Sequence, residues 1–157
     1  MNKVAITGLG IVCSLGNNKE EVILSLQEGR SGISFCDEYR NLNFRSHVHG
    51  APDIDIDAMV DRKQRRFMGD GAAYNFIAMQ KAIEDAGLTK EEVSNDRTGL
   101  IMGSGGPSTR NLLSAFNTVK ERGARKVGPF MVPRTMSSTN SATLSTAFEI
   151  KGVNYSI

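Results

Sequence analysis

The stretch TGLIMGSGG, residues 98–106, decides the fold expected for this chain. Its small and apolar first half ends on glycines, which is the pattern of a short buried strand followed by a turn. A second such run closes the chain at residues 153–157, and two helical patterns, at residues 112–122 and 136–148, separate the two runs. Strands separated by helices pair in parallel, because the chain must cross back before it runs in the same direction again. The sequence therefore predicts an α/β fold.

The clearest helical pattern covers residues 71–86, where apolar side chains recur every three or four positions before Gly87. A short apolar run at 4–7, rich in β-branched residues, predicts a buried strand. Two capping boxes are also predicted, Asn18 with Glu21 and Thr89 with Glu92. The first opens a helix with an apolar stripe that ends at Gly29. Residues 33–61 mix short extended pieces with turn residues, which predicts a long irregular excursion.

Composition narrows the possible function classes. The 157 residues suit one domain, and a net charge of +2 is too small for wholesale nucleic-acid binding. No apolar run is long enough to span a membrane, and the start of the sequence leaves no room for a signal peptide, which predicts a cytoplasmic protein. Two cysteines make no disulfide framework, and two histidines without a Cys/His cluster predict no metal site and no cofactor.

A glycine pair, Gly8 and Gly10, follows the first predicted strand and raises the alternative of a dinucleotide-binding domain. That fingerprint requires a helix to begin inside the motif, so that its N–H groups face a pyrophosphate. Here the helical pattern starts only after Asn18, and Cys13 stands where the third glycine belongs. The residues therefore disfavour nucleotide binding.

Two basic clusters stand out on this nearly neutral chain. One is the run DRKQRR at residues 61–66, and the other contains Lys120, Arg122, Arg125 and Lys126. Each could be an ordinary solvated face. Two local clusters nevertheless indicate docking of a discrete acidic partner better than they indicate a nucleic-acid surface.

Two segments rich in small residues are open to a structural and a functional interpretation. Residues 103–106 form either a tight turn or, because glycines leave room, a slot for a chain-like substrate. Residues 134–146 are dense in Ser and Thr and form either an exposed linker or a packed helix that another surface approaches closely, such as a second subunit. No nucleophile–base pair can be assembled, because the histidines, His47 and His49, lie in the irregular segment.

Several segments in order resemble the β-ketoacyl-[acyl-carrier-protein] synthases, and the type I enzymes of bacterial dissociated systems in particular. The opening AITGLGIV at 5–12, LGN at 15–17 and GRSGI at 29–33 match the start of that family. The further matches are RSHV at 45–48, DRK at 61–63, RFM at 66–68 with Asp70, GSGG at 103–106 and GVNYSI at 152–157. Each motif alone is weak, but the ordered set is specific.

The resemblance implies a thiolase-like fold, in which two α/β halves pack as α-β-α-β-α layers and assemble as a homodimer. It also implies a two-stage reaction of fatty-acid synthesis. A cysteine at the start of a buried helix accepts an acyl chain from acyl-carrier protein. Malonyl-carrier protein then loses carbon dioxide, and its carbanion attacks the thioester. Two histidines assist the decarboxylation, and backbone N–H groups stabilise the oxyanion.

The resemblance places residues 1–157 in the amino-terminal portion of the first half, with no second domain. It predicts a fragment without catalytic residues, because the family's cysteine and both histidines lie downstream and neither Cys13 nor Cys36 matches the nucleophile. An incomplete sheet predicts marginal stability or self-association. The alternative is a non-catalytic carrier-protein-binding or chain-length-factor-like module.

The family's peripheral sites carry over to this sequence by position. Carrier-protein binding falls on Arg62, Lys63, Arg66, Arg125 and Lys126. The neighbourhood of the acyl pocket falls on Gly105, Gly106 and Pro107, where the proline is a departure from the small residue that the family pattern leads us to expect. The dimer interface falls on Met136, Ser137 and Ser138.

Overall fold

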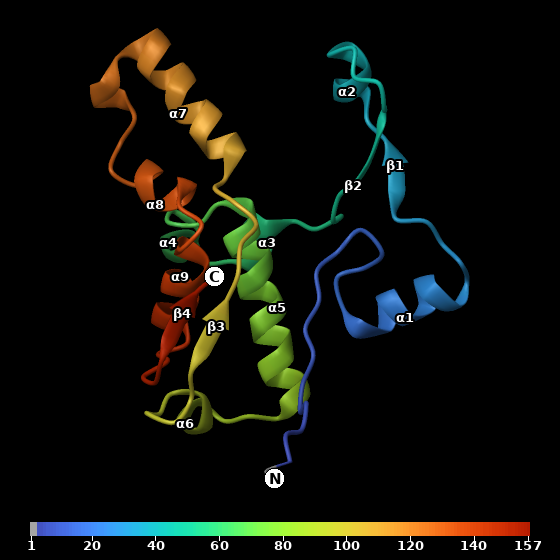
Figure 1. The fold of residues 1–157 in the computed structure, drawn as a ribbon, viewed down its shortest axis with the longest axis vertical. Helices are drawn as coiled ribbons and strands as arrows, with labels where there is room; N and C mark the ends of the chain where they lie inside the picture. The colour runs from blue at the N-terminus through green and yellow to red at the C-terminus, as the bar shows by residue number, and fades with distance from the viewer. Residues whose placement is uncertain (1–2) are drawn as a thin grey trace. The chain divides into compact units, whose positions relative to one another are not determined.

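The computed structural model describes residues 3–157 as short strands among helices (Figure 1). The strands are β1 (Ile33–Phe35), β2 (Val48–Gly50), β3 (Leu100–Met102) and β4 (Asn154–Ser156). The helices before β3 are α1 (Lys19–Gln27), α2 (Asp37–Asn41), α3 (Ile56–Met59), α4 (Arg62–Arg65), α5 (Asp70–Ala86) and α6 (Lys90–Val93). The helices after β3 are α7 (Thr109–Arg122), the 3₁₀ helix η1 (Ala124–Lys126), α8 (Met131–Thr135) and α9 (Thr139–Ala147).

The parallel strand pair predicted from the sequence is present. β3 and β4 pair in parallel, with Leu100 opposite Asn154 and Met102 opposite Ser156. Residues 33–61, predicted to be irregular, contain an antiparallel pair in which Ile33 of β1 lies opposite Gly50 of β2. The α/β character is therefore confirmed, and the excursion is more regular than its turn-rich sequence indicates.

The buried strand predicted at residues 4–7 is wrong. These residues join no strand in the described chain, and the side chains of Val4 and Ile6 are 95% and 92% exposed. A strand is stable only when its backbone groups pair with a neighbouring strand. Local β-propensity cannot supply that neighbour, so the pattern alone overstates the structure.

The described chain divides into two compact units. One contains residues up to Asp55 together with Ala78–Ala86, and the other contains Ile56–Ile77 and Gly87–Ile157. Helix α5 contributes residues to both units.

In the first unit, residues 8–19 pack along the last turns of α5. The N–H of Leu9 donates to Oδ2 of Asp85 at 3.0 Å, and Lys19 forms an ion pair with the same carboxylate at 2.5 Å. These two interactions, the Lys19 hydrogen bond first, lower the pKa of Asp85 below its ordinary value. Lys81 also donates to the backbone oxygen of Asn17. Polar contacts from one helix thus hold an otherwise irregular segment.

Helix α1 begins as predicted but differs in two details. The side chain of Asn18 accepts a hydrogen bond from the N–H of Glu21 at 2.8 Å, which confirms the N-cap. The carboxylate of Glu21 reaches the N–H of Asn17 rather than that of Asn18, so the capping box is shifted by one residue. The predicted apolar stripe is not buried, since Leu26 is 65% exposed and only Ser25 is buried on this helix.

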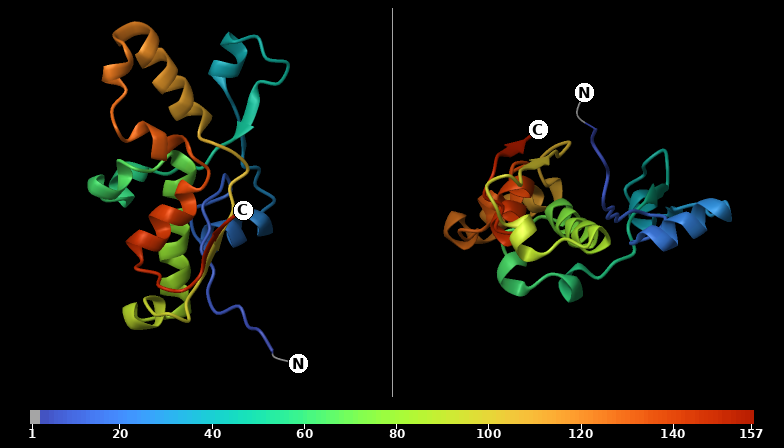
Figure 2. Two further views of the ribbon diagram at one scale, coloured as in Figure 1. Left: turned by 60° about the vertical axis from the view of Figure 1, so that its left-hand side comes forward. Right: turned by 90° about the horizontal axis from the view of Figure 1, so that it is seen from below.

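The second unit holds most of the buried apolar side chains, and α9 packs against β3 and β4 (Figure 2). Met68, Ile77 and Leu144 are fully buried. The rings of Phe76 and Phe148 lie 5.2 Å apart. Helix α5 matches the predicted periodicity and ends before Gly87, whose φ of +65° suits a residue without Cβ.

The loop after α5 confirms the second capping prediction. Thr89 and Glu92 form a reciprocal capping box at the start of α6. Lys90 of the same helix forms an ion pair with Glu149 at 2.8 Å, and this hydrogen bond is the main cause of the lowered pKa of Glu149.

The helix predicted for residues 136–148 is confirmed over Thr139–Ala147, but it begins three residues later than expected. Helix α8 ends at Thr135, Met136 has an extended ψ of 136°, and α9 begins at Thr139. The Thr139 hydroxyl donates to the Pro133 carbonyl oxygen, and the Asn140 amide donates to that of Ser137 at 2.8 Å. Such side-chain bonds compete with the helical ladder, so the four-residue spacing that starts at Met136 extends beyond the start of the helix.

Between residues 3 and 157, no helix has the length and apolar character needed to cross a bilayer. The same part of the chain contains no group of three or more His, Cys, Asp or Glu placed to hold a metal ion.

Candidate functional site

The basic run at residues 61–66 forms the short helix α4 and turns most of its cations outward. Asp61 caps the helix by accepting from the N–H of Lys63 at 2.8 Å. Arg62, Lys63 and Arg66 are exposed. Arg65 differs, because its side chain is 22% exposed and pairs with Asp70 at 2.8 Å. The structure thus separates three surface cations, which we call the α4 basic cluster (Arg62, Lys63 and Arg66), from one internal cation.

Arg66 is held in place by two aromatic rings. Its guanidinium carbon lies 5.6 Å from the ring centre of Phe67 and 5.5 Å from that of Phe130. The two rings meet edge to face at 5.1 Å, and Nε of Arg66 donates to the backbone oxygen of Lys63 at 3.0 Å. Cation–π contacts and a backbone bond reduce the freedom of the side chain, so less entropy is lost when it binds a carboxylate.

The second basic cluster lies after α7. Arg125 and Lys126 lie in η1 and are exposed, and Gly123 begins this turn with a φ of +83°. Neither side chain forms an ion pair with any residue in the described part of the chain. Phe130, four residues beyond Lys126, contacts Arg66. The loop after η1 therefore reaches the α4 basic cluster, although no contact joins the two sets of cations.

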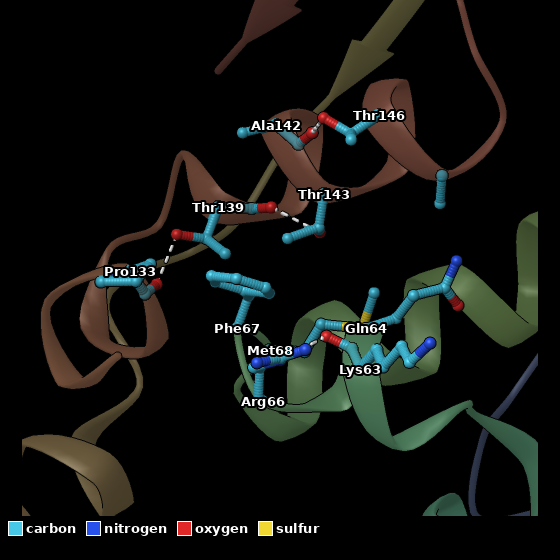
Figure 3. A pocket seen from close by; sticks show the side chains of 11 residues that line it. Lys63, Gln64, Arg66, Phe67, Met68, Pro133, Thr139, Ala142, Thr143 and Thr146 are labelled. Carbon is cyan, nitrogen blue, oxygen red and sulfur yellow. Dashed lines mark hydrogen bonds between the residues drawn. The ribbon is translucent and has the colours of Figure 1, made fainter. Parts of the chain in front are cut away.

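An apolar groove of about 570 Å³ opens beside the α4 basic cluster, between the segment around α4 and helix α9 (Figure 3). We call it the Phe67 groove. Its lining residues are Lys63, Gln64, Arg66, Phe67, Met68, Pro133, Thr139, Ala142, Thr143, Thr146 and Ala147. The sequence pattern did not indicate this groove. The signal available was the apolar pair Phe67–Met68 directly after the cations, but the opposite wall comes from residues about 75 positions later.

The residues assigned to the acyl pocket lie just beyond β3. Gly105, Gly106 and Pro107 are exposed, and a Cβ on either glycine would meet no atom within 4 Å. Gly106 and Pro107 line a second cavity of about 380 Å³, together with Asp70 and Arg110. Ser104 ties the turn together by donating to the carbonyl oxygen of Gly106 at 3.0 Å. The assignment of an acyl pocket stays a prediction.

The residues assigned to a dimer interface lie at the break between α8 and α9. Met136 is 51% exposed, and Ser137 and Ser138 are half-buried. Helix α9 itself is packed as predicted, but its partner is the same chain, since Asn75 donates to Oδ1 of Asn140 at 2.9 Å. The interface assignment also stays a prediction.

The cysteines and histidines take structural positions. Cys36 is buried and Cys13 half-buried, and both thiols are free. His47 packs edge-on against Phe35 at 6.0 Å, and His49 against Tyr39 at 5.6 Å. These contacts are those of packed rings.

The glycines that suggested nucleotide binding serve helix packing. A Cβ on Gly10 would lie 1.7 Å from the carbonyl oxygen of Ala78, and one on Gly8 would lie 2.2 Å from that of Ala82. The close approach that requires glycine is therefore to the backbone of α5.

This arrangement of a parallel strand pair, glycine turn and basic helix agrees with the family indicated by the motifs. The chain belongs to the β-ketoacyl synthases, because the family's N-terminal domain matches residues 1–157. Among curated relatives it is similar to 3-oxoacyl-[acyl-carrier-protein] synthase 1 of Haemophilus influenzae, with 51% identity across the whole chain. The chain spans 39% of the length of that relative.

Solved structures confirm the fold class. The ishigamide ketosynthase/chain length factor matches 97% of this chain and 38% of its own, with a TM-score of 0.84 at 19% identity. A type II polyketide synthase acyl-carrier protein in complex with its ketosynthase (AntDE:AntF) matches 97% of this chain and 40% of its own, with a TM-score of 0.72 at 15% identity. At these identities the likeness establishes the α/β fold of the thiolase-like ketosynthases.

Proposed function

We propose that the protein containing this chain is a condensing acyltransferase that elongates an acyl-carrier protein thioester with malonyl-carrier protein in fatty-acid synthesis. The 51% identity to 3-oxoacyl-[acyl-carrier-protein] synthase 1 supports this reaction class. The observation that carries the proposal for this part of the protein is the α4 basic cluster, in which three exposed cations lie on or directly after one short helix and Arg66 contacts two rings.

The role proposed for the α4 basic cluster is to dock the acidic carrier protein. Charges that face solvent attract an oppositely charged partner over about one Debye length, roughly 8–10 Å at ordinary salt. They increase the rate of encounter and orient the partner more than they increase the final affinity. Arg125 and Lys126 form a second exposed cluster, which we assign to the same partner. The structural neighbour that contains a ketosynthase with its acyl-carrier protein supports a carrier-protein partner.

The proposal assigns no catalytic group to these 157 residues. The acyl group is transferred to a cysteine outside them, where a helix N-terminus stabilises the thiolate. Gly105, Gly106 and Pro107 border the acyl chain. The chain by itself is therefore expected to form no acyl-enzyme and to release no carbon dioxide from malonyl-carrier protein.

The proposal includes a homodimer in the cytoplasm. Met136, Ser137 and Ser138 belong to the proposed interface. An exposed apolar stripe on α7 supports a protein partner, since Leu112, Phe116 and Val119 recur on one helix face and are 54%, 66% and 46% exposed.

The test is a condensation assay on the protein that contains this chain at the length of its relatives. Charge reversal at Arg62 and Lys63 should raise the KM for the carrier protein about tenfold with little change in kcat, because docking precedes the chemistry. Arg97→Glu, an exposed reversal outside both clusters, is the matched control. Unchanged kinetics in the double variant would refute the docking assignment.

The same assay separates the leading function from the non-catalytic alternative. A chain-length-factor-like module would bind carrier protein without forming an acyl-enzyme, and the neighbour described as a ketosynthase/chain length factor favours considering it. Intact-mass measurement after incubation with acyl-carrier protein detects the thioester adduct that only the enzyme forms.

A further inference from the structure

The Phe67 groove combines an apolar interior with a cationic rim. Phe67, Met68, Pro133, Ala142 and Ala147 supply ring, thioether and methyl surface. Figure 3 shows the Phe67 ring between α9 and the segment around α4. The volume of about 570 Å³ is within the range of roughly 300–1,000 Å³ that small-molecule sites occupy.

The threonines that line the groove offer it methyl groups rather than free hydroxyls. The hydroxyl of Thr143 donates to the backbone oxygen of Thr139 at 2.6 Å, and that of Thr146 donates to the backbone oxygen of Ala142 at 2.8 Å (Figure 3). The hydroxyl of Thr139 is likewise bound to the Pro133 carbonyl. Because each hydroxyl proton is already used within the chain, this wall favours alkyl surface over a polar ligand.

The rim supplies two cations that are not neutralised. Lys63 and Arg66 both line the groove, and within residues 3–157 neither forms an ion pair. Arg65 has its carboxylate partners elsewhere, on Asp57 and Asp70. The rim of this apolar cavity therefore carries two cations without a carboxylate partner.

We propose that the Phe67 groove binds an amphipathic anion with a medium-length alkyl chain, a fatty carboxylate in chemical class. The alkyl chain lies along α9 and against Phe67, and the carboxylate meets Lys63 and Arg66 at the rim. This site is separate from the acyl-pocket residues 105–107, none of which lines the groove. The inference does not depend on the proposed enzymatic function, although the two share Lys63 and Arg66.

The test is a titration of the ¹⁵N-labelled chain with decanoate. The amide chemical shifts of the chain are measured at each decanoate concentration. Saturable shifts are expected at residues 66–68 and 139–147. Decanol should bind more weakly by about three- to tenfold, because it lacks the ion pair with the rim. Decyltrimethylammonium has the same chain with the opposite charge and should bind more weakly than decanol.

Two variants separate the alkyl and carboxylate contacts. Ala142→Phe fills the groove from an exposed helix position and should abolish binding of decanoate and decanol alike. Lys63→Glu should weaken decanoate about three- to tenfold and leave decanol unchanged. Arg62→Glu is the matched control, since Arg62 lies beside Lys63 but does not line the groove, and it should leave the decanoate affinity within about twofold.

Three results would overturn the inference. Equal affinity for the three ligands, or shifts centred on the exposed apolar face of α7, would indicate detergent-like adsorption. Unchanged binding in Ala142→Phe would place the ligand elsewhere. All measurements omit carrier protein, so a failure here leaves the docking proposal intact. An unchanged carrier-protein KM in the variant reversed at Arg62 and Lys63 likewise leaves this site intact.

Discussion

Replacing Gly10 by alanine tests whether the glycines after residue 7 serve packing rather than ligand binding. The new Cβ would lie 1.7 Å from the carbonyl oxygen of Ala78 and 2.8 Å from the amide nitrogen of Ala82, whereas ordinary contact begins at 3.4 Å. Both neighbours are backbone atoms of α5, so no side-chain rotation can relieve the overlap. Residues 8–11 must therefore shift away from the helix.

The size of the effect follows from that overlap. Overpacking a well-filled site costs about 1–3 kcal/mol, and an overlap against rigid helix backbone belongs at the upper end, about 3 kcal/mol. The shift also weakens the hydrogen bond from the Leu9 N–H to Asp85. Urea unfolding followed by far-UV circular dichroism measures the loss as a lower midpoint at constant slope.

Gly71→Ala is the matched control for the same experiment. Gly71 lies in the first turn of α5, and a Cβ there would meet no atom within 4 Å. Alanine in a helix is more favourable than glycine by about 0.5–1 kcal/mol, so this variant should be slightly more stable than the parent chain. The packing argument is refuted if Gly10→Ala stays within about 0.5 kcal/mol of the parent chain.

Three further substitutions test the remaining parts of the fold. Leu144→Ala removes a fully buried side chain and should cost about 2–5 kcal/mol in urea unfolding; a smaller loss would mean that α9 is not packed as described. Thr89→Ala removes the capping box of α6 and should cost about 0.5–2 kcal/mol, with no loss expected if the cap is absent in solution. Asp85→Asn should lower Tm at neutral pH. Because Lys19 and the Leu9 N–H hold the pKa of Asp85 below 3.8, its contribution is present above that value and is lost as the pH falls through the lowered pKa. The Tm difference should therefore disappear in acid, and a difference that persists there would contradict the assignment.

The helices and their ends were the most predictable features, because local chemistry determines them. The periodicity of α5 and the stop at Gly87 require only neighbouring residues. The caps at Asn18 and Thr89 likewise depend on a side chain and an amide two or three positions away. The predicted partner of the Glu21 carboxylate was wrong by one residue, because the carboxylate accepts from the N–H of Asn17 and not from that of Asn18.

Features that depend on distant partners were harder to predict. The β-branched residues 4–7 have the composition of a strand but have no strand to pair with in the described chain. The helix predicted across residues 136–148 begins only at Thr139, where the side chains of Thr139 and Asn140 hydrogen-bond to carbonyl groups of the preceding residues. Side-chain bonds of this kind leave no trace in apolar spacing.

The candidate site shows the same division. The sequence marked Arg62, Lys63 and Arg66 as surface cations, which the structure confirms, and the resemblance assigns them to docking, which stays a prediction. The sequence could not show that Phe67 and Phe130 both contact Arg66, because these rings are 63 positions apart in the sequence and meet only in the fold. The Phe67 groove was missed for the same reason.

The most direct test of the account is the affinity of holo-acyl-carrier protein for this chain as a function of salt. The account predicts binding that weakens about tenfold or more between roughly 20 and 200 mM salt and is lost when Arg62, Lys63 and Arg66 are all changed to glutamate. An affinity that ignores salt, or one that survives the triple reversal, would contradict the central claim that the α4 basic cluster receives the carrier protein.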